Sequence, residues 1–196
     1  MTLTRARDTE LRQAATRLFR ERGFHATSMQ DLAEALDLNK GSLYHYIASK
    51  DELLWTIVSE ALERLEAQVR PLLCSDLPGA ERLHAAIVEH LRFAADHGDE
   101  LALLQIELRS LPPGRRTTII ERRDAYEALW RDAIQAGIDE GKVRADTPVR
   151  FAGITILSAC NWFAQWYRPD GPLSVDELAQ MLGDLFWRGL RAEEAP

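Results

Sequence analysis

The stretch NKGSLYHYIASKDELL, residues 39–54, brings several kinds of hydrogen-bond donor close together in the chain. The donors are an ammonium group, a hydroxyl, a phenol and an imidazole, on Lys40, Ser42, Tyr44 and His45. Such donors bind the phosphate oxygens of nucleic acids. Three consecutive rings, ending at Tyr46, cannot all face one core, because neighbours on a helix lie about 100° apart. At least one ring must therefore point outward, toward a partner.

Two short helices are expected to position these side chains. Ser28 and Asp31 form an S-x-x-D capping box, which predicts the start of the first helix. Asn39 can cap a second helix at 40–46. Two short helices with a four-residue connection indicate a helix-turn-helix, whose second helix enters the major groove of DNA.

The second helix of this motif meets base edges with its N-terminal residues. We therefore expect Lys40 and Ser42 to donate to bases or phosphates. Gly41 has no side chain and lets the backbone come close to the groove. Tyr44 and His45 are expected to reach the flanking phosphates.

Further candidates flank the second helix. Thr27 and Ser28 begin the first helix, where free amides favour a phosphate, and Lys50 adds a cation at the next helix start. Tyr46 is expected to face inward, against the first helix. The DNA-contacting candidates are Thr27, Ser28, Asn39, Lys40, Gly41, Ser42, Tyr44, His45 and Lys50.

Helical periodicity runs through almost the whole chain. Apolar residues recur three and four positions apart, as in the stripes from Leu11 to Phe19 and from Leu53 to Val69. No alternating run is long enough to indicate a strand. The pattern predicts an all-α protein of nine helices with a sizeable core, since 46% of the residues are hydrophobic.

Charge is divided unevenly along the 196 residues, whose net charge is −7. Residues 1–50 hold 8 Lys and Arg against 6 Asp and Glu, whereas residues 51–196 hold 16 against 25. The first part can approach a polyanion, and the remainder repels one. The charge and the short N-terminal helices together predict a DNA-binding domain at 1–48 and a second helical domain at 49–196.

Residues 23–54, GFHATSMQDLAEALDLNKGSLYHYIASKDELL, resemble the DNA-binding domain of TetR-family transcriptional regulators. The elements of the family pattern have counterparts at Gly23-Phe24, Thr27-Ser28, Leu32-Ala33, Gly41, Leu43-Tyr44, Tyr46, Ser49-Lys50-Asp51 and Leu53. Tyr46 departs from it, since the family often has Phe there, and so does the apolar Ile47-Ala48 pair. The resemblance implies a TetR-like architecture, in which a common DNA reader joins a variable ligand-binding and dimerisation domain.

The resemblance also implies a homodimer whose interface combines the helices at 147–167 and 174–192 with those of a second copy. The 149–167 helix is apolar on most of its circumference and so needs cover on all sides. A dimer explains how one small reader recognises a palindromic operator. The candidate interface residues are Phe151, Ile154, Met181, Leu182, Leu185 and Phe186.

The second domain resembles a TetR subgroup that senses acyl-CoA thioesters and includes repressors of fatty-acid, phenylacetate and sterol degradation. The resemblance rests on the pattern N-W-x-x-x-W-Y-R-P-x-G-x-L-S from Asn161 and on the arginine-rich segment 107–144. Guanidinium groups suit the phosphates of coenzyme A, and an apolar lumen suits the acyl group. The ligand-binding candidates are Phe93, His97, Leu104, Arg109, Arg116, Arg123, Tyr126, Trp130, Asn161, Trp162 and Trp166.

Other interpretations of these residues remain open. Trp162 and Trp166, four positions apart, also fit a core or a dimer interface, and the arginines fit a solvated helix face with acidic neighbours. His90 and His97 share a helix face, which indicates lining or core residues more than metal ligands.

Other functions are weighed against this hypothesis. The sequence has no nucleophile elbow, Gly-rich phosphate loop, HExxH or CxxC, so we expect no enzyme activity and no metal. A regulator that senses a hydrophobic or cationic drug-like molecule is the alternative. A transcriptional activator and a purely architectural helical protein are also compatible with the predicted helices. The arginines favour an anionic effector.

The remaining observations concern the compartment. The two cysteines, Cys74 and Cys160, match no metal spacing and indicate free thiols in a reducing cytosol. The start, MTLTRARDTELRQ, lacks the apolar region of a signal peptide, and polar residues interrupt the apolar stretch Val149–Tyr167. We therefore expect a cytoplasmic protein without cofactor or membrane contact, with operator DNA as partner and an acyl-CoA as effector.

Overall fold

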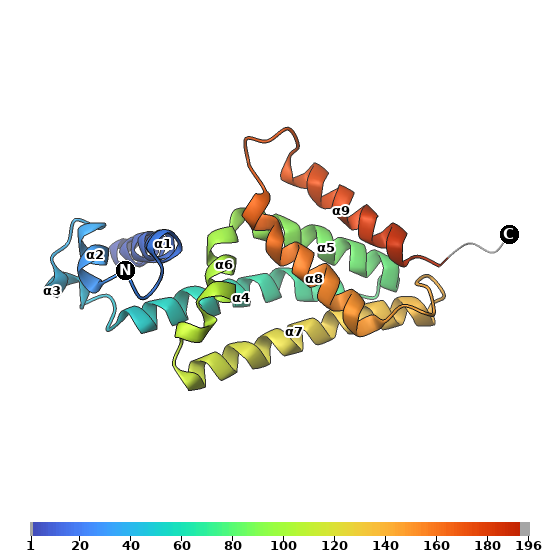
Figure 1. Cartoon of the computed structure of the whole chain (residues 1–196), viewed down its shortest axis with the longest axis horizontal. Coiled ribbons are helices and arrows are strands. Elements are labelled where there is room, and N and C mark those ends of the chain that lie inside the picture. The colour runs from blue at the N-terminus through green and yellow to red at the C-terminus, as the bar shows by residue number, and fades with distance from the viewer. Residues whose placement is uncertain (1, 193–196) are drawn as a thin grey trace. The chain divides into compact units, whose positions relative to one another are not determined.

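The computed structural model describes the backbone of residues 2–192 and the side chains from residue 7 to residue 192. Within this range the chain forms nine α-helices, one 3-10 helix and no strand (Figure 1). This confirms the all-α prediction. Their bounds are α1 Thr2–Arg22, α2 Met29–Glu34, α3 Lys40–Leu43, α4 Lys50–Leu73, α5 Gly79–Asp96, α6 Gly98–Ile106, η1 Leu108–Ser110, α7 Pro113–Asp139, α8 Val149–Trp166 and α9 Val175–Leu190.

Local capping explains where several helices begin. Ser28 and Ser174 each form a full capping box, with Asp31 before α2 and with Glu177 before α9. Before α4 the capping box is incomplete. The Ser49 hydroxyl accepts the Glu52 amide at 3.1 Å, but the Glu52 carboxylate accepts the amide of Ala48 instead of that of Ser49. These side chains satisfy amides that a helix start leaves without partners.

The described chain packs as two compact units, of which the first contains residues 2–62 and 99–119. In this unit α2 contacts both α1 and α3 (Figure 1). The rings of Phe19 and Phe24 meet edge to face at 5.2 Å, and Leu32 and Leu43 are fully buried beside the turn between α2 and α3. The short helices are thus held by apolar packing, since helices of this length are not stable alone.

Residues 99–119 are tied to the segment that follows α1. Glu107 accepts the Phe24 backbone amide at 3.1 Å, and the Ser110 hydroxyl lies 3.2 Å from the His25 ring nitrogen Nε2. Arg20 of α1 pairs with Asp99 of α6 at 3.3 Å. These polar contacts connect segments that are about 80 residues apart in sequence.

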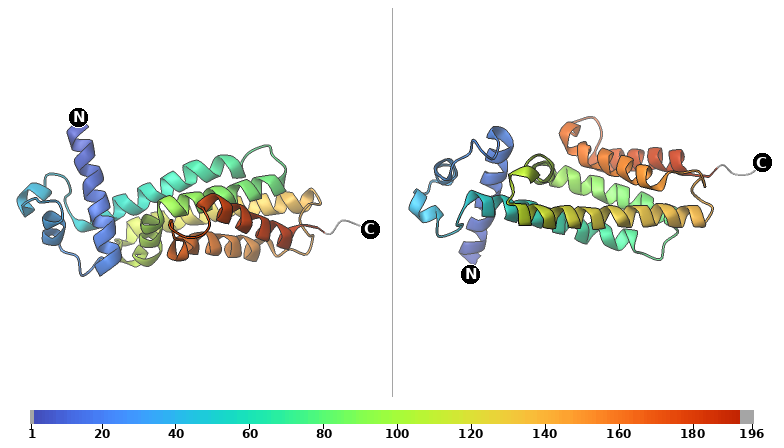
Figure 2. Two further views of the ribbon diagram at one scale, coloured as in Figure 1. Left: turned by 90° about the horizontal axis from the view of Figure 1, so that it is seen from above. Right: turned by 60° about the horizontal axis from the view of Figure 1, so that its bottom comes forward.

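The second unit contains residues 63–98 and 120–192 of the described chain. Here α5 lies beside both α8 and α9 (Figure 2). Two polar pairs join α5 to α9, namely Arg92 with Asp176 at 2.7 Å and His84 with Asp184 at 3.2 Å. The start of α5 approaches α7 so closely that a Cβ on Gly79 would lie 2.6 Å from the nitrogen of Gly137.

The two units do not follow the division expected from charge and resemblance, because residues 49–62 and 99–119 pack with the N-terminal helices. The functional boundary at residue 48 therefore stays a prediction. None of the helices within residues 2–192 is both long enough and apolar enough to cross a membrane.

Candidate nucleic-acid interface and effector-binding cluster

The turn between α2 and α3 has the geometry of a helix-turn-helix. The amide of Leu38 returns to the carbonyl of Ala33 at 2.9 Å, and Asp37 takes a left-handed backbone conformation with φ of 53°. Asp and Asn tolerate this conformation better than other residues with side chains, which explains the residue type found here. The turn fixes the direction in which α3 leaves α2.

The capping box of α2 is also an electrostatic feature. The hydroxyl and amide of Ser28 both hydrogen-bond the Asp31 carboxylate, and these bonds hold the pKa of Asp31 below its usual value. Ser28 is exposed, so its hydroxyl remains at the surface at the start of α2. Its contact with a phosphate stays a prediction.

Helix α3 presents the predicted donors to solvent. The Asn39 side chain accepts the Ser42 amide at 2.7 Å and fixes the start of the helix. Lys40, Gly41, Tyr44 and His45 are exposed, with 48% of Tyr44 accessible. Leu43 is the residue that α3 buries. Leu43 thus makes the core contact of α3, whereas Lys40 and Gly41 on the helix and Tyr44 and His45 just after it form the exposed surface with the candidate DNA contacts.

Three expectations for this region are wrong, and the first concerns Tyr46. This ring was expected to pack inward, yet 38% of it is exposed. The reason is the length of α3, which ends at Leu43 and is followed by a turn, so Tyr46 is not on the buried helix face. The adjacent Ile47 is only half-buried and takes part of the inner position.

The second correction concerns Thr27, whose side chain is 1% exposed. Its hydroxyl donates to the carbonyl of Gly23 at 2.9 Å, with the Leu18 carbonyl at 3.4 Å. Carbonyls at the end of a helix lack partners within the helix, and here Thr27 supplies one. The buried hydroxyl closes the end of α1 and cannot meet a phosphate.

The third correction concerns Lys50, whose ammonium group is engaged inside the protein. It donates to the carbonyls of Phe24 at 2.8 Å, Thr27 at 2.9 Å and His25 at 3.3 Å. It also lies 4.5 Å from the centre of the Phe24 ring. An ammonium group has three donors, and all three are used. Lys50 therefore holds the α1–α2 connection and does not offer a free cation to DNA.

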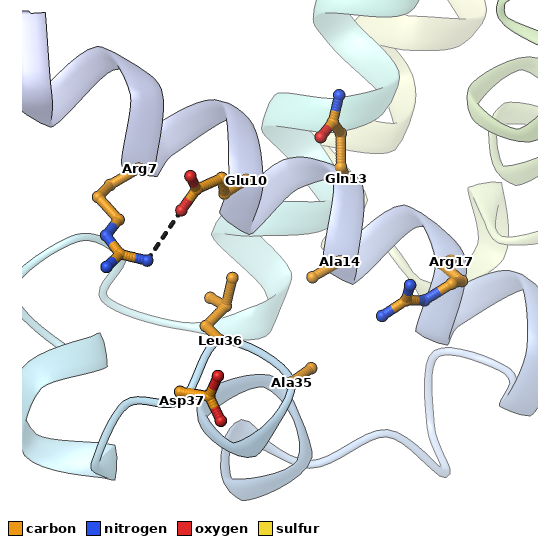
Figure 3. Close-up of a pocket in the computed structure, with 8 residues that line it drawn as sticks. All are labelled: Arg7, Glu10, Gln13, Ala14, Arg17, Ala35, Leu36 and Asp37. Atoms are coloured by element: carbon orange, nitrogen blue, oxygen red, sulfur yellow. Dashed lines mark hydrogen bonds and ion pairs between the residues drawn. The ribbon is translucent and has the colours of Figure 1, made fainter.

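A shallow groove on the first unit does not extend this surface. The groove, of about 340 Å³, lies between α1 and the end of α2 (Figure 3). Arg7 and Arg17 line it together with Glu10 and Asp37, and Arg7 pairs with Glu10 at 2.9 Å. The charges balance, so the groove provides no net attraction for an anion.

The predicted ligand residues divide between the two units. Leu104, Arg109 and Arg116 belong to the first unit, and Leu104 is buried while Arg109 is exposed. The candidates in the second unit are Phe93, His97, Arg123, Tyr126, Trp130, Asn161, Trp162 and Trp166. Trp162 and Trp166 are 62% and 46% exposed, so they do not line an interior of this single chain.

A polar and aromatic cluster lies in the core of the second unit, between α5 and α7. The rings of His90, Tyr126 and Trp130 form a triangle with centres 5.9 to 6.1 Å apart. The Tyr126 hydroxyl lies 3.2 Å from the His90 nitrogen Nδ1. His90 and Trp130 are fully buried. Tyr126 and Trp130 were among the ligand candidates, whereas His90 was expected as a lining or core residue and was not named among them.

Burial sets the protonation of this cluster. It lowers the pKa of His90 to about 4, while a hydrogen bond with the Asn161 side chain acts in the opposite sense. Burial also raises the pKa of Tyr126 and raises that of Cys160 to about 12. All three groups are therefore neutral near pH 7.

The low pKa of His90 predicts a pH-dependent stability. Between about pH 4 and 6.5 the unfolded chain binds the proton that native His90 refuses, so stability is lost as the pH falls. Full protonation corresponds to about 3 kcal/mol of unfolding free energy. Urea unfolding at pH 7.5 and pH 5 measures the loss, which we expect to shrink in His90→Gln. An equal loss in that variant would contradict the assignment.

Comparison with known proteins decides the family. Residues 11–55 match the model of bacterial regulatory proteins of the tetR family, and residues 76–190 match the tetracyclin repressor-like C-terminal domain. The chain belongs to the TetR family. Members of this family are DNA-binding transcriptional regulators, so the protein is a regulator and not an enzyme.

Relatives of this TetR-family protein match along almost the whole chain. The HTH-type transcriptional repressor KstR2 of Rhodococcus jostii is 32% identical over 94% of this chain and 91% of its own length. The structure of the ketosteroid regulator KstR2 of Mycobacterium tuberculosis superposes with a TM-score of 0.89, at 30% identity over 95% and 96% of the two chains. A structure of AibR with isovaleryl coenzyme A and operator DNA superposes with a TM-score of 0.81, at 26% identity over 91% and 97%.

The second unit of this TetR-family chain also carries an exposed apolar face. Six large apolar side chains on α8 and α9 are between 37% and 65% exposed, namely Phe151, Ile154, Trp162, Trp166, Met181 and Leu185. Leu182 and Phe186, which we also assigned to an interface, are half-buried. An exposed apolar face of this size on a folded protein is typical of an interaction site.

Proposed function

We propose that this TetR-family regulator is a homodimeric repressor that an acyl-CoA thioester releases from its operator. The observation that carries the proposal is the exposed surface of α3 and the turn after it, where Lys40, Tyr44 and His45 are exposed while Leu43 is buried. Residues 1–48 would read DNA, and residues 49–196 would bind the effector and dimerise. A chromosomal regulator works in the cytoplasm, where we place it.

The exposed faces of α8 and α9 support the dimer. Each copy would cover the apolar side chains of the other, from Phe151 to Leu185, so that both copies lose an unfavourable contact with water. A two-fold dimer also presents two copies of α3, which suits a palindromic operator. The operator contact therefore depends on the interface in the second unit.

Relatives support the effector class. AibR is a structural neighbour along nearly the whole chain and was solved with isovaleryl coenzyme A and operator DNA. The second unit offers Arg123 on α7, one turn before the buried Tyr126, as a group for a phosphate. By analogy, the effector would bind more tightly to the dimer that cannot hold DNA, and only this difference in affinity drives release.

The test combines two measurements on the full-length protein. An operator is first selected from random DNA, and its release is then followed by fluorescence anisotropy. The probes are isovaleryl-, octanoyl- and phenylacetyl-CoA, with free coenzyme A, the free acids and a cationic dye as comparison. Release by a thioester alone supports the proposal. Release by the dye, with no response to any thioester, supports a drug-like effector and overturns the acyl-CoA assignment.

Tyr44 provides a test of the reader. Tyr44 is 48% exposed and is not among the core residues, so Tyr44→Ala should leave stability within about 0.5 kcal/mol. We expect operator affinity to fall about tenfold, and equally across operator variants, because a phosphate contact carries no base information. Titration against a panel of variant sites measures both. Unchanged affinity would place Tyr44 outside the interface.

A further inference from the structure

Two oppositely charged side chains hold one residue of the segment between α1 and α2, namely Phe24. The Glu107 carboxylate accepts the Phe24 amide at 3.1 Å, and the Lys50 ammonium group donates to the Phe24 carbonyl at 2.8 Å. Glu107 lies between α6 and η1, and Lys50 is the first residue of α4. The Phe24 side chain is also buried in the core, with 2% exposed. Contacts from three directions therefore fix this residue.

A chain of hydrogen bonds extends the contact that Glu107 makes. The Ser110 hydroxyl donates to the other carboxylate oxygen of Glu107 at 2.7 Å and lies 3.2 Å from the His25 nitrogen Nε2. A hydroxyl has one proton to donate, and the carboxylate accepts it, so Nε2 of His25 must be the donor to Ser110. Both carboxylate oxygens are thus engaged, and they fix two consecutive residues, Phe24 and His25.

The position of Phe24 affects where α2 and α3 lie. The Phe24 carbonyl also accepts the Thr27 amide at 3.3 Å, so residues 24–27 form a turn. Ser28, the N-cap of α2, follows directly after this turn. Helix α2 in turn contacts α3. A displacement of Phe24 is therefore passed to the start of α2 and, through the packing of α2, to the exposed surface of α3.

The charge of Glu107 separates a role in positioning from a role in direct contact. The side chain is an anion, and the phosphates of DNA repel anions. If Glu107 acted on DNA through its charge alone, its removal would strengthen operator binding. A role in positioning predicts the opposite sign, because the loss of the hydrogen bonds would free the segment that carries α2 and α3.

We propose that Glu107 is a positioning residue for operator binding, an inference that rests on the operator contact of α3 proposed above. By holding Phe24 it keeps α2 and α3 in the orientation that suits the major groove. Without the carboxylate the segment adopts further arrangements, and the Kd rises in inverse proportion to the fraction that fits DNA. A residue far from α3 in sequence thus sets operator affinity without contacting DNA.

Two variants of Glu107 test the proposal on the full-length protein, by anisotropy with the selected operator. Glu107→Ala should raise the Kd about tenfold or more, because it removes charge-assisted hydrogen bonds. The slope of log affinity against log salt should stay the same, since the bound state keeps its phosphate contacts. Glu107→Gln retains an oxygen for the Phe24 amide and should recover most of the affinity, because neutral hydrogen bonds have about half the strength of charge-assisted ones.

Two further variants complete the experiment. Glu21→Ala is the matched control, because Glu21 is an exposed acidic residue of α1 in the same unit, and its removal should leave operator affinity unchanged or slightly higher. Ser110→Ala removes the hydroxyl but leaves the bond between Glu107 and Phe24, so we expect a smaller rise in Kd, about threefold. Urea unfolding of each variant identifies the conditions in which it is fully folded, and binding is measured there.

The outcomes separate this inference from the proposed function. If Tyr44→Ala binds the operator like the unchanged protein, α3 does not contact DNA in the proposed way, and both proposals fall. If Tyr44→Ala binds weakly while Glu107→Ala keeps or gains affinity, only the positioning role is overturned. An equal loss in Glu107→Gln and Glu107→Ala overturns it as well. If Glu107→Ala does not fold, Ser110→Ala decides, and unchanged affinity in that variant overturns the inference.

Discussion

Leu185→Glu is expected to convert the protein to a monomer and to reduce operator affinity at least 100-fold. Leu185 is 63% exposed in the single chain and lies among the apolar side chains of α8 and α9. A dimer would bury the new carboxylate without a partner, and this cost removes the interface. The second DNA-binding domain then belongs to a separate molecule. The gain in operator affinity from joining two DNA-binding domains in one dimer, about 100-fold or more, is therefore lost.

Sedimentation measures the mass of the variant against the 22.2 kDa of one chain, and anisotropy measures operator binding. Leu77→Glu is the matched control, because Leu77 is 43% exposed but belongs to the connection between α4 and α5 and not to the helices α8 and α9 of the proposed interface. We expect the control to remain a dimer. A Leu185→Glu protein that also sediments as a dimer would contradict the interface on α9.

Lys50→Met is expected to lower the free energy of unfolding by about 2–4 kcal/mol. The change removes three charge-assisted hydrogen bonds to the carbonyls of Phe24, His25 and Thr27, of which two are partly buried. It also removes the contact of the ammonium group with the Phe24 ring. These bonds hold the segment between α1 and α2, so the loss acts on folding before it acts on DNA.

Lys40→Met makes the opposite prediction and is the matched control. Lys40 is exposed on α3, so its loss should leave the urea midpoint unchanged and weaken operator binding. The salt dependence of binding should become shallower by about one counterion for Lys40 if it contacts a phosphate, and stay the same for Lys50. A shift of base preference would instead assign Lys40 to a base. A stable Lys50→Met that loses affinity for DNA would restore Lys50 as a DNA contact.

The elements that follow from local chemistry could be predicted from the sequence. Capping residues such as Ser28 and Ser174 act within one turn of themselves, so their role is visible in four residues of sequence. The apolar stripes predicted the helices, and the spacing of α2 and α3 predicted the helix-turn-helix. The exposed position of Tyr44 follows from the same helical period.

The residues that were misassigned have partners far away in the sequence. Lys50 and the carbonyl of Phe24 are 26 residues apart, and nothing in either local pattern reveals the bond. Tyr46 was misplaced because α3 is one turn shorter than its pattern indicates. The spacing of His90 among apolar neighbours predicted a lining or core position, but its contact with the Tyr126 hydroxyl, 36 residues away, could not be read from that spacing.

The shortness of α3, Lys40–Leu43, has a consequence for how such a regulator finds its target in a genome. A single helical turn contacts only a short sequence of bases, and a short sequence recurs by chance at many places on a bacterial chromosome. Those places compete for the protein, so their number matters as much as affinity. Two copies of this short sequence at one fixed spacing occur by chance with a frequency equal to the product of the two single-site frequencies, so they are much rarer. Selectivity would then be set largely by the distance between two readers, which evolution can retune without altering a single DNA-contacting residue.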